Sequence, residues 1–266
     1  MSYLRLPPRT ARQPLGRPGI RWNDPLARGL VLAAPDGWRD AASGRYATLD
    51  NAPTYGPHAS LHGDVGIAQT FASSQKITFA LPEGLVRPLS VACIAYLTDR
   101  NAAEEVATVK AGGNYYGILG RGDTGGNQAQ AASSGGSFRA RISIGSAYAA
   151  RRVIVATFEP GPLNVADPVY NIYVDGVAGT SYSVASSPIN DVATVLASGS
   201  YTGVVSGLSV WNRVIDADEV KALGVDNWQM FAADVRRVYF LGPSSAPSSF
   251  NPAWAANANT LIQRAA

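Results

Sequence analysis

The chain has 266 residues, of which 46% are hydrophobic and only 15% charged. This composition excludes an intrinsically disordered protein and suits one large β domain or two small domains. The single cysteine, Cys93, excludes an internal disulfide, and its place in the apolar run "LSVACIAYL" predicts a buried, unreactive thiol. The start "MSYLRLPPRT" lacks the apolar centre of a secretory signal, and no apolar run is long enough to span a membrane. We therefore expect a soluble protein made in the cytoplasm, with no membrane partner.

The net charge of +3 is distributed unevenly. Residues 1–28 hold six arginines against one aspartate, a charge of +5 that leaves −2 for the rest of the chain. The same stretch holds five prolines, which fix φ and remove backbone donors, so it can be neither a helix nor a central strand. We expect residues 1–28 to form an extended arm on a protein partner, and the acidic remainder argues against nucleic acid. The arginines expected to pair with that partner are Arg5, Arg9, Arg12, Arg17 and Arg21.

Residues 29–241 break into about a dozen short apolar or alternating segments, the spacing of an all-β sandwich. In chain order these are "GLVLAA", "VGIAQTF", "KITFAL", "LSVACIAYLT", "EEVATVK", "NYYGILG", "SFRARISIG", "RRVIVATF", "YNIYVDGV", "GTSYSVA", "ATVLASGS" and "VVSGLSVWNRV". Two stretches read as loops instead. The first follows "GLVLAA", runs to about residue 64 and is rich in Asp, Gly and Pro. The second is "GRGDTGGNQAQAASSGG" at 120–136. We interpret its RGD tripeptide as part of a loop and not as an adhesion motif.

The segment "YNIYVDGVAG" at 170–179 carries the strongest local signal. Tyr170, Ile172 and Val174 alternate onto one face, and Asp175-Gly176 follows as a two-residue turn. We expect a hairpin whose aspartate serves the turn.

One helix is predicted near the end of this body. Asp216 is placed as an N-cap with Glu219 three residues later, a capping box, and Gly224 is a plausible stop. We expect "DNWQMF" at 226–231 to add a helical turn and "RRVYFL" at 236–241 to add a strand.

Residues 242–266 are too polar for a core and too apolar for a simple linker. Phe250, Trp254 and Leu261 are spaced along this tail as apolar anchors. We expect an extended C-terminal tail that docks these anchors on a neighbouring molecule.

Three segments together resemble concanavalin A-like, laminin-G-like jelly rolls. They are "GLVLAAPDGWRDAASGRYATL" at 29–49, "YNIYVDGV" at 170–177 and "GLSVWNRVIDADEVKAL" at 207–223. In that family they correspond to the first strand with its Asp-Ala-Ser-Gly turn, a hairpin, and the closing strand with its short helix. The resemblance implies a concanavalin A-like β-sandwich with one short helix near the C-terminal end. Its relatives that bind calcium or glycans do so from loops at the rim of the sandwich.

The flanking segments resemble those of such domains in tailed-bacteriophage virion proteins. "WNDPLARGLVLA" precedes the domain, and "DNWQMFAADVRRVYF" and "FNPAWAANANTLIQ" follow it. This resemblance implies a location in the virion.

The sequence argues against an enzyme. Retaining glucanases of this fold carry two glutamates on one strand, but Glu104 and Glu105 are adjacent and would face opposite sides of a strand. His58 and His62 have a zinc-binding spacing only on a helix, which the surrounding glycine and proline disfavour. No Gly-x-Ser-x-Gly motif is present.

Two binding hypotheses stay open. Calcium is the weaker one, since no spacing marks a dedicated loop; its candidate ligands are Asp99, Asp123, Asp167, Asn190 and Asp191. Tyrosines could line a glycan-binding face, although we favour a role in covering the sandwich; these are Tyr115, Tyr116, Tyr148, Tyr182 and Tyr201.

These observations favour a non-enzymatic structural protein of a tailed-phage virion, with no required cofactor. Its arms would bind the major capsid protein or another virion protein, as a capsid decoration or head-attached appendage, and a homotrimer is expected. The alternatives are a carbohydrate-binding adhesin that recognises a host surface glycan, and a polysaccharide-degrading enzyme, which the missing glutamate pair puts last.

Overall fold

The computed structural model describes residues 18–51, 53–58, 66–71, 75–81, 89–97, 103–111, 114–123, 126–133, 140–144, 151–159, 169–183, 194–197 and 203–232. These residues are mostly strands, joined by one 3-10 helix, η2, and one α-helix, α1. The predicted all-β class with one short helix near the C-terminal end of the body is confirmed.

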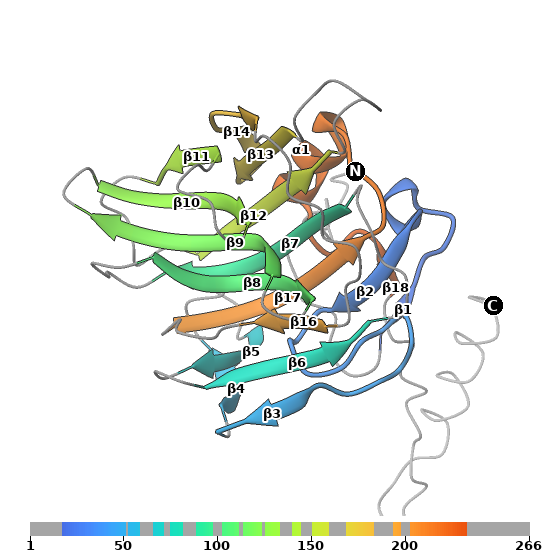
Figure 1. The fold of residues 1–266 in the computed structure, drawn as a ribbon. Coiled ribbons are helices and arrows are strands. Elements are labelled where there is room, and N and C mark those ends of the chain that lie inside the picture. Colours follow the sequence, from blue (N-terminus) through green and yellow to red (C-terminus); the bar gives the residue numbers. More distant parts are fainter. Residues whose placement is uncertain are drawn as a thin grey trace, which may run out of the picture. The chain divides into compact units, whose positions relative to one another are not determined.

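Two large antiparallel sheets make up most of the body (Figure 1), and β1 (Gly19–Ile20) and β18 (Phe231–Ala232) form a separate two-stranded sheet. The seven-stranded sheet has the order β11 (Ala140–Ser143), β10 (Gly126–Ser133), β9 (Asn114–Asp123), β8 (Ala103–Ala111), β16 (Thr194–Ala197), β6 (Lys76–Ala80) and β3 (Thr48–Asp50). The nine-stranded sheet has the order β14 (Val177–Ala178), β13 (Val169–Val174), β12 (Arg151–Phe158), β7 (Leu89–Leu97), β17 (Gly203–Trp211), β5 (Gly66–Phe71) and β4 (Thr54–His58). In addition, β15 (Tyr182–Ser183) pairs with β13, and β2 (Leu30–Ala34) pairs with β17.

The two sheets pack face to face on a core that we call the main core. Alternate residues of several strands point into it, as Tyr170, Ile172 and Val174 of β13 do. Tyr116, Phe158 and Tyr170 meet there at ring-centroid distances of 5.1 to 5.9 Å. Each such buried side chain contributes roughly 1.5–3 kcal/mol to stability.

A second core lies on the outer face of the nine-stranded sheet. Ala92 and Ile94 of β7 point into it, whereas Val91, Cys93 and Ala95 point into the main core. Both faces of β7 are therefore covered, which explains why "LSVACIAYL" is apolar throughout. As predicted, Cys93 is buried, and burial raises the pKa of its thiol to about 12.

The hairpin expected at 170–179 is present, and its aspartate serves more than the turn. Asp175 and Gly176 both adopt positive φ, 52° and 79°, between β13 and β14. The Asp175 carboxylate accepts the backbone N–H of Val153 at 2.9 Å and pairs with the Arg152 guanidinium at 2.8 Å. The turn is thereby fixed to the neighbouring strand β12.

The helix α1 (Ala217–Val225) begins as predicted, with a complete capping box between Asp216 and Glu219. It continues past Gly224 to a C-cap at Asp226, so the glycine does not end the helix. Gly224 is needed for packing instead, because a Cβ on it would lie 2.7 Å from the carbonyl carbon of Asp175 and the nitrogen of Gly176. The helix therefore rests directly on the β13–β14 turn.

The prediction of a loop at 120–136 is wrong over most of this stretch. β9 and β10 form a long antiparallel hairpin there, and Arg121, Gly122 and Asp123 lie within β9. The glycines and alanines of this stretch have low strand propensity, but Ala129 and Ala131 are fully buried in the main core. Packing here overrides propensity.

The loop expected up to about residue 64 also contains strands. β3 pairs with β6, and β4 pairs with β5. Pro57 lies in β4, which closes one end of the described sheet order, a position where a missing backbone N–H is tolerated. His58 ends β4, and His62 lies outside the described residues.

The described part of residues 1–28 is not an extended arm. Gly19–Ile20 form β1, which pairs with β18 (Phe231–Ala232), and Pro25–Ala27 form the 3-10 helix η2. Leu26 is buried in the second core, which gives this segment an apolar anchor within the body. The predicted helical turn at 226–231 is a series of turns that leads into β18, and the predicted strand at 236–241 lies outside the described residues.

Candidate interaction surface

The short pairing of β1 with β18 brings the two ends of the body together. Gly19 lies opposite Ala232, and Ile20 lies opposite Phe231, in antiparallel register. In such a pair the chain before one strand and the chain after the other lie at the same end. The segments that precede Gly19 and follow Ala232 therefore leave the body at one point, which we call the exit surface together with the exposed residues Arg21 and Trp22.

Buried contacts hold this pairing on the body. The backbone N–H of Arg21 donates to Met230 O at 2.9 Å. Met230 and Phe231 lie in the second core with Leu26. The Trp211 indole Nε1 donates to Leu26 O at 2.6 Å, so the end of β17 is joined to η2.

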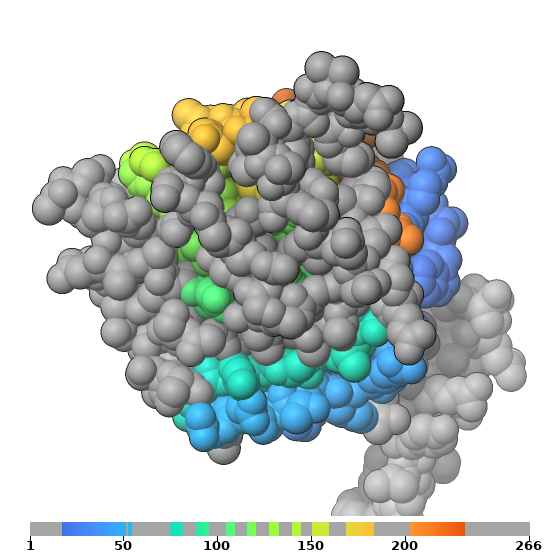
Figure 2. Space-filling model, in the orientation of Figure 1, coloured from blue at the N-terminus to red at the C-terminus, as the bar shows by residue number. Residues whose placement is uncertain are grey.

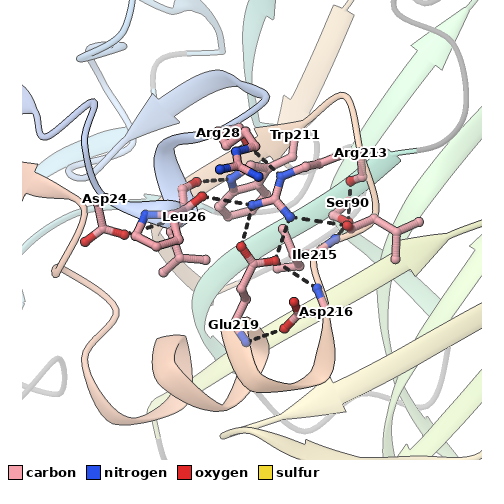
Figure 3. Close-up of polar contacts among 11 residues, drawn as sticks. Asp24, Leu26, Arg28, Ser90, Trp211, Arg213, Ile215, Asp216 and Glu219 are labelled. Carbon is pink, nitrogen blue, oxygen red and sulfur yellow. Dashed lines mark hydrogen bonds and ion pairs between the residues drawn. The ribbon is translucent and has the colours of Figure 1, made fainter.

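Arg213 joins η2 to α1 beside Trp211 (Figure 3). Its guanidinium forms a bidentate pair with Glu219, with both N–O distances 2.6 Å, and donates to the carbonyls of Arg28 and Pro25. Glu219 also accepts the backbone N–H of Asp216 at 2.9 Å, so one carboxylate caps the helix and binds the arginine.

The Ser90 hydroxyl extends the same network to β7. It donates to Arg213 O at 2.8 Å and accepts the N–H of Ile215 at 3.0 Å (Figure 3). These groups are used within the fold, so they fix the position of the exit surface and are not free to bind a ligand.

The exit surface exposes an aromatic ring beside a positive charge. Trp22 is 62% exposed, and Arg21 next to it is exposed as well. Asp24 caps η2 by accepting the N–H of Leu26 at 2.9 Å. Burial raises the pKa of the Asp226 carboxyl, while the N–H of Trp228 and the charge of Arg21 act to lower it.

Of the predicted partner-binding residues, the structure places only Arg21, at the exit surface. The others lie outside the described residues: Arg5, Arg9, Arg12, Arg17, Phe250, Trp254 and Leu261. Trp22 was missed by the sequence analysis, although its place beside Arg21 in a proline-rich stretch is a usable signal. The β1–β18 pairing had no local signal, because its two partners lie near opposite ends of the chain.

The described residues offer little support for a calcium site or for a catalytic pair of glutamates. Within them, no group of three or more His, Cys, Asp or Glu side chains is placed to hold a metal ion. Glu104 and Glu105 lie in β8, where the register shifts after Glu105. Asp123 ends β9, and the remaining calcium candidates lie outside the described residues: Asp99, Asp167, Asn190 and Asp191.

Two of the five candidate glycan-binding tyrosines have described side chains. Tyr116 is fully buried in the main core, and Tyr182 is partly buried against it. Both cover the sandwich, as the favoured interpretation predicted. Tyr115 lies in β9, and Tyr148 and Tyr201 lie outside the described residues.

Neither a protein-family model nor a curated protein sequence matches this chain. Solved structures do match it. Domain 4 of an extracellular GH43 arabinanase from Geobacillus stearothermophilus, in complex with arabinotriose, is 15% identical with a TM-score of 0.55, covering 73% of this chain and 98% of that domain.

Two further solved structures are similar over the same share of the chain. The binding domain of botulinum neurotoxin DC, in complex with SialylT, is 9% identical with a TM-score of 0.54, covering 74% of this chain and 51% of that one. Trypanosoma rangeli sialidase is 13% identical with a TM-score of 0.51, covering 74% of this chain and 33% of the enzyme.

The fold is a lectin-like β-sandwich. At these identities the likeness concerns the fold alone. This chain spans nearly all of the arabinanase domain, about half of the toxin structure and a third of the sialidase. Among the described residues, no helix has the length and apolar character to cross a membrane.

Proposed function

We propose that this chain is a non-enzymatic structural protein of a tailed-phage virion, a concanavalin A-like, laminin-G-like sandwich attached to the particle by its two terminal extensions. The β1–β18 pairing carries the proposal, because both extensions leave the body at one point. Two binding segments that start side by side can engage neighbouring sites on one partner, and their effects on affinity then multiply. The likeness of the flanking segments to those of phage virion proteins supports the virion as the setting.

The two extensions differ in chemistry, and so do the sites they would occupy. Arg5, Arg9, Arg12 and Arg17 of the N-terminal extension would pair with an acidic surface of the major capsid protein or another virion protein. Phe250, Trp254 and Leu261 of the C-terminal extension would fill apolar pockets on the same assembly or on a neighbouring copy, consistent with a homotrimer.

Co-sedimentation with phage particles that lack the chain tests this proposal. The full chain should bind in near-stoichiometric amount, and a variant with Arg5, Arg9, Arg12 and Arg17 changed to Gln should bind far less at low salt. The control is Arg141→Gln, which removes an exposed arginine in β11. Equal binding by the quadruple variant and the control would overturn the role of the basic extension.

Carbohydrate binding is the second candidate. It is favoured by two similar solved structures that are complexes, one with arabinotriose and one with SialylT. In this function the sandwich itself recognises a host surface glycan, and the extensions are dispensable for that recognition. Removing residues 1–17 and 233–266 separates the two candidates, because it should abolish particle binding and leave glycan binding unchanged.

A further inference from the structure

We propose that the turn at residues 36–47 binds a sugar that carries a carboxylate, such as a sialic or uronic acid residue of a glycan. The apolar face of the sugar would stack on Tyr46, and its carboxylate would bind the Arg39 guanidinium. This inference deepens the second function proposed above and rests on it. None of the tyrosines singled out from the sequence belongs to this site.

The turn is held in one conformation by two aspartates. Asp36 accepts the backbone N–H groups of Trp38 and Arg39 at 2.9 and 3.1 Å. Asp40 is buried and accepts three backbone N–H groups, from Ala33, Ala42 and Ser43, at 2.9 to 3.0 Å, together with the Ser43 hydroxyl. A site on this turn would therefore be preorganised, which lowers the entropic cost of binding.

A short ladder within the turn sets Arg39 beside Tyr46. The two residues face each other across an isolated antiparallel bridge. The flanking bonds, from Asp40 N to Arg45 O at 2.8 Å and from Ala47 N to Trp38 O at 2.9 Å, identify this as a non-hydrogen-bonded pair. Side chains of such a pair lie on one face and approach most closely.

The Tyr46 ring packs against Trp38 on one side and is open to solvent on the other. Its ring lies 5.8 Å from the ring of Trp38 at an interplanar angle of 59°, and Trp38 packs against the main core. Tyr46 is nevertheless 51% exposed, one of the few large side chains of the described residues that remain so open. An aromatic ring that is rigid and half exposed is suited to stacking against the C–H face of a sugar.

The charge beside this ring selects the class of sugar. Among the described residues, no carboxylate pairs with Arg39 or with Arg45, whereas Arg152 and Arg213 each pair with an acidic side chain. The Arg39 guanidinium lies over the turn, where a Cβ placed on Gly44 would be 3.2 Å from its Nη2. A guanidinium that no described carboxylate occupies, beside an aromatic face, matches a carboxylate on a sugar ring, since arginine binds carboxylates through two parallel hydrogen bonds.

The turn also lies at the molecular surface. Figure 2 shows the light-blue segment that leads into β3 as a rim of the molecule, next to the teal surface of β6. The neighbouring cation on that edge, Lys76, is already paired with Asp50 at 2.9 Å. The charge of Lys76 is therefore balanced locally, whereas no described carboxylate pairs with Arg39.

Calorimetry on the full chain tests the site with sialyllactose and trigalacturonate as acidic probes, and lactose and arabinotriose as neutral ones. We expect binding of at least one acidic probe, and at least tenfold weaker binding after Arg39→Gln or Tyr46→Ala. Tyr46→Phe should bind as the parent does, because the ring is kept. Arg141→Gln is the matched control for loss of an exposed arginine, and unchanged thermal unfolding of each variant excludes misfolding.

Three outcomes would overturn the inference. If the acidic probes bind equally well to Arg39→Gln and Tyr46→Ala, glycan binding stands but lies elsewhere. If neutral and acidic probes bind alike, the carboxylate plays no part. If no probe binds the parent chain, both the inference and the glycan-binding function fail, while attachment through the extensions is unaffected.

Discussion

Arg213 and Glu219 form a bidentate ion pair across the junction between β17 and α1, with both N–O distances 2.6 Å. The same arginine holds the carbonyls of Pro25 and Arg28, and the same glutamate caps the helix at Asp216. Both residues belong to "GLSVWNRVIDADEVKAL" at 207–223, one of the three segments on which the resemblance to laminin-G-like domains rests. The contacts of Arg213 thereby hold residues 25–28, which precede β2, against the segment that follows β17.

Loss of this pair should destabilise the body in a graded way. Arg213→Gln removes the charge and several hydrogen bonds, and leaves Glu219 partly buried without its partner. We expect a loss of about 2–4 kcal/mol in the free energy of unfolding by urea. Glu219→Gln keeps the capping hydrogen bond and should cost about half as much. As a control, Lys76→Gln breaks an exposed pair and should change stability by less than about 1 kcal/mol. Equal effects of all three would contradict this account.

The position of an N-terminal truncation should decide whether the body folds. Removal of residues 1–17 leaves β1 and η2 intact and should change the unfolding midpoint little. Removal of residues 1–28 takes away buried Leu26, the acceptor of the Trp211 indole and the partner strand of β18. We expect this longer truncation to lose at least about 3 kcal/mol, measured by urea unfolding. A body of unchanged stability after removal of 1–28 would show that the segment is an arm after all.

Gly224→Ala should destabilise the protein although alanine is the better helix former. The new Cβ would lie 2.7 Å from the Asp175 carbonyl carbon and the Gly176 nitrogen, and backbone atoms on both sides cannot move away cheaply. Helix propensity alone would give a gain of about 1 kcal/mol. We expect a net loss of more than about 1 kcal/mol in thermal or urea unfolding. Val225→Ala, at the exposed neighbouring position, should be nearly neutral, and a stabilised Gly224→Ala variant would disprove the contact.

The Asp175 carboxylate accepts a backbone N–H from Val153 and forms an ion pair with Arg152. Two substitutions separate the contributions of these contacts to stability. Asp175→Asn keeps the acceptor for the Val153 N–H and tolerates the φ of 52°, so it should cost about 1 kcal/mol for the pair with Arg152. Asp175→Ala loses both contacts and adds backbone strain, and should cost about 2–3 kcal/mol. Urea midpoints of the two variants are the measurement. Equal losses would show that only the ion pair matters.

Asp226 should make a pH-dependent contribution to stability. Burial raises the pKa of its carboxyl in the folded state above the ordinary value of 3.8. Its contribution is therefore present below that ordinary value and lost as the pH rises through the folded-state pKa. The ionised form also places a negative charge at the C-terminus of α1. Asp226→Asn, which keeps the acceptor for the Trp228 N–H, should stabilise the protein by a few tenths of a kcal/mol at pH 7 and not at pH 3. A gain at pH 3 equal to that at pH 7 would contradict this reasoning.

The sequence predicted what depends on local pattern. The apolar run of β7, the alternation of β13 and the capping box of Asp216 and Glu219 each have a distinct signal, and each is found in the structure. The β9–β10 hairpin was missed because its small residues signal a loop, while their value lies in packing that no local window shows.

The exit surface was missed for a different reason. Prolines and arginines dominate residues 1–28 and hide Gly19, Ile20 and Leu26, which bind partners at the far end of the chain. The Arg39–Tyr46 pair was also overlooked, because the turn around it reads as an ordinary loop. Its geometry depends on the buried carboxylate of Asp40 and not on strand pattern.

In the proposed function, the two extensions act together from the β1–β18 pair. The most direct test is the affinity for particles that lack the protein, measured for the full chain and for chains without residues 1–17, without 233–266, or without both. Loss of either extension should weaken binding by roughly two to four orders of magnitude, because each supplies a high local concentration for the other. Loss of both should abolish attachment. A body without either extension that binds as tightly as the full chain would contradict the claim.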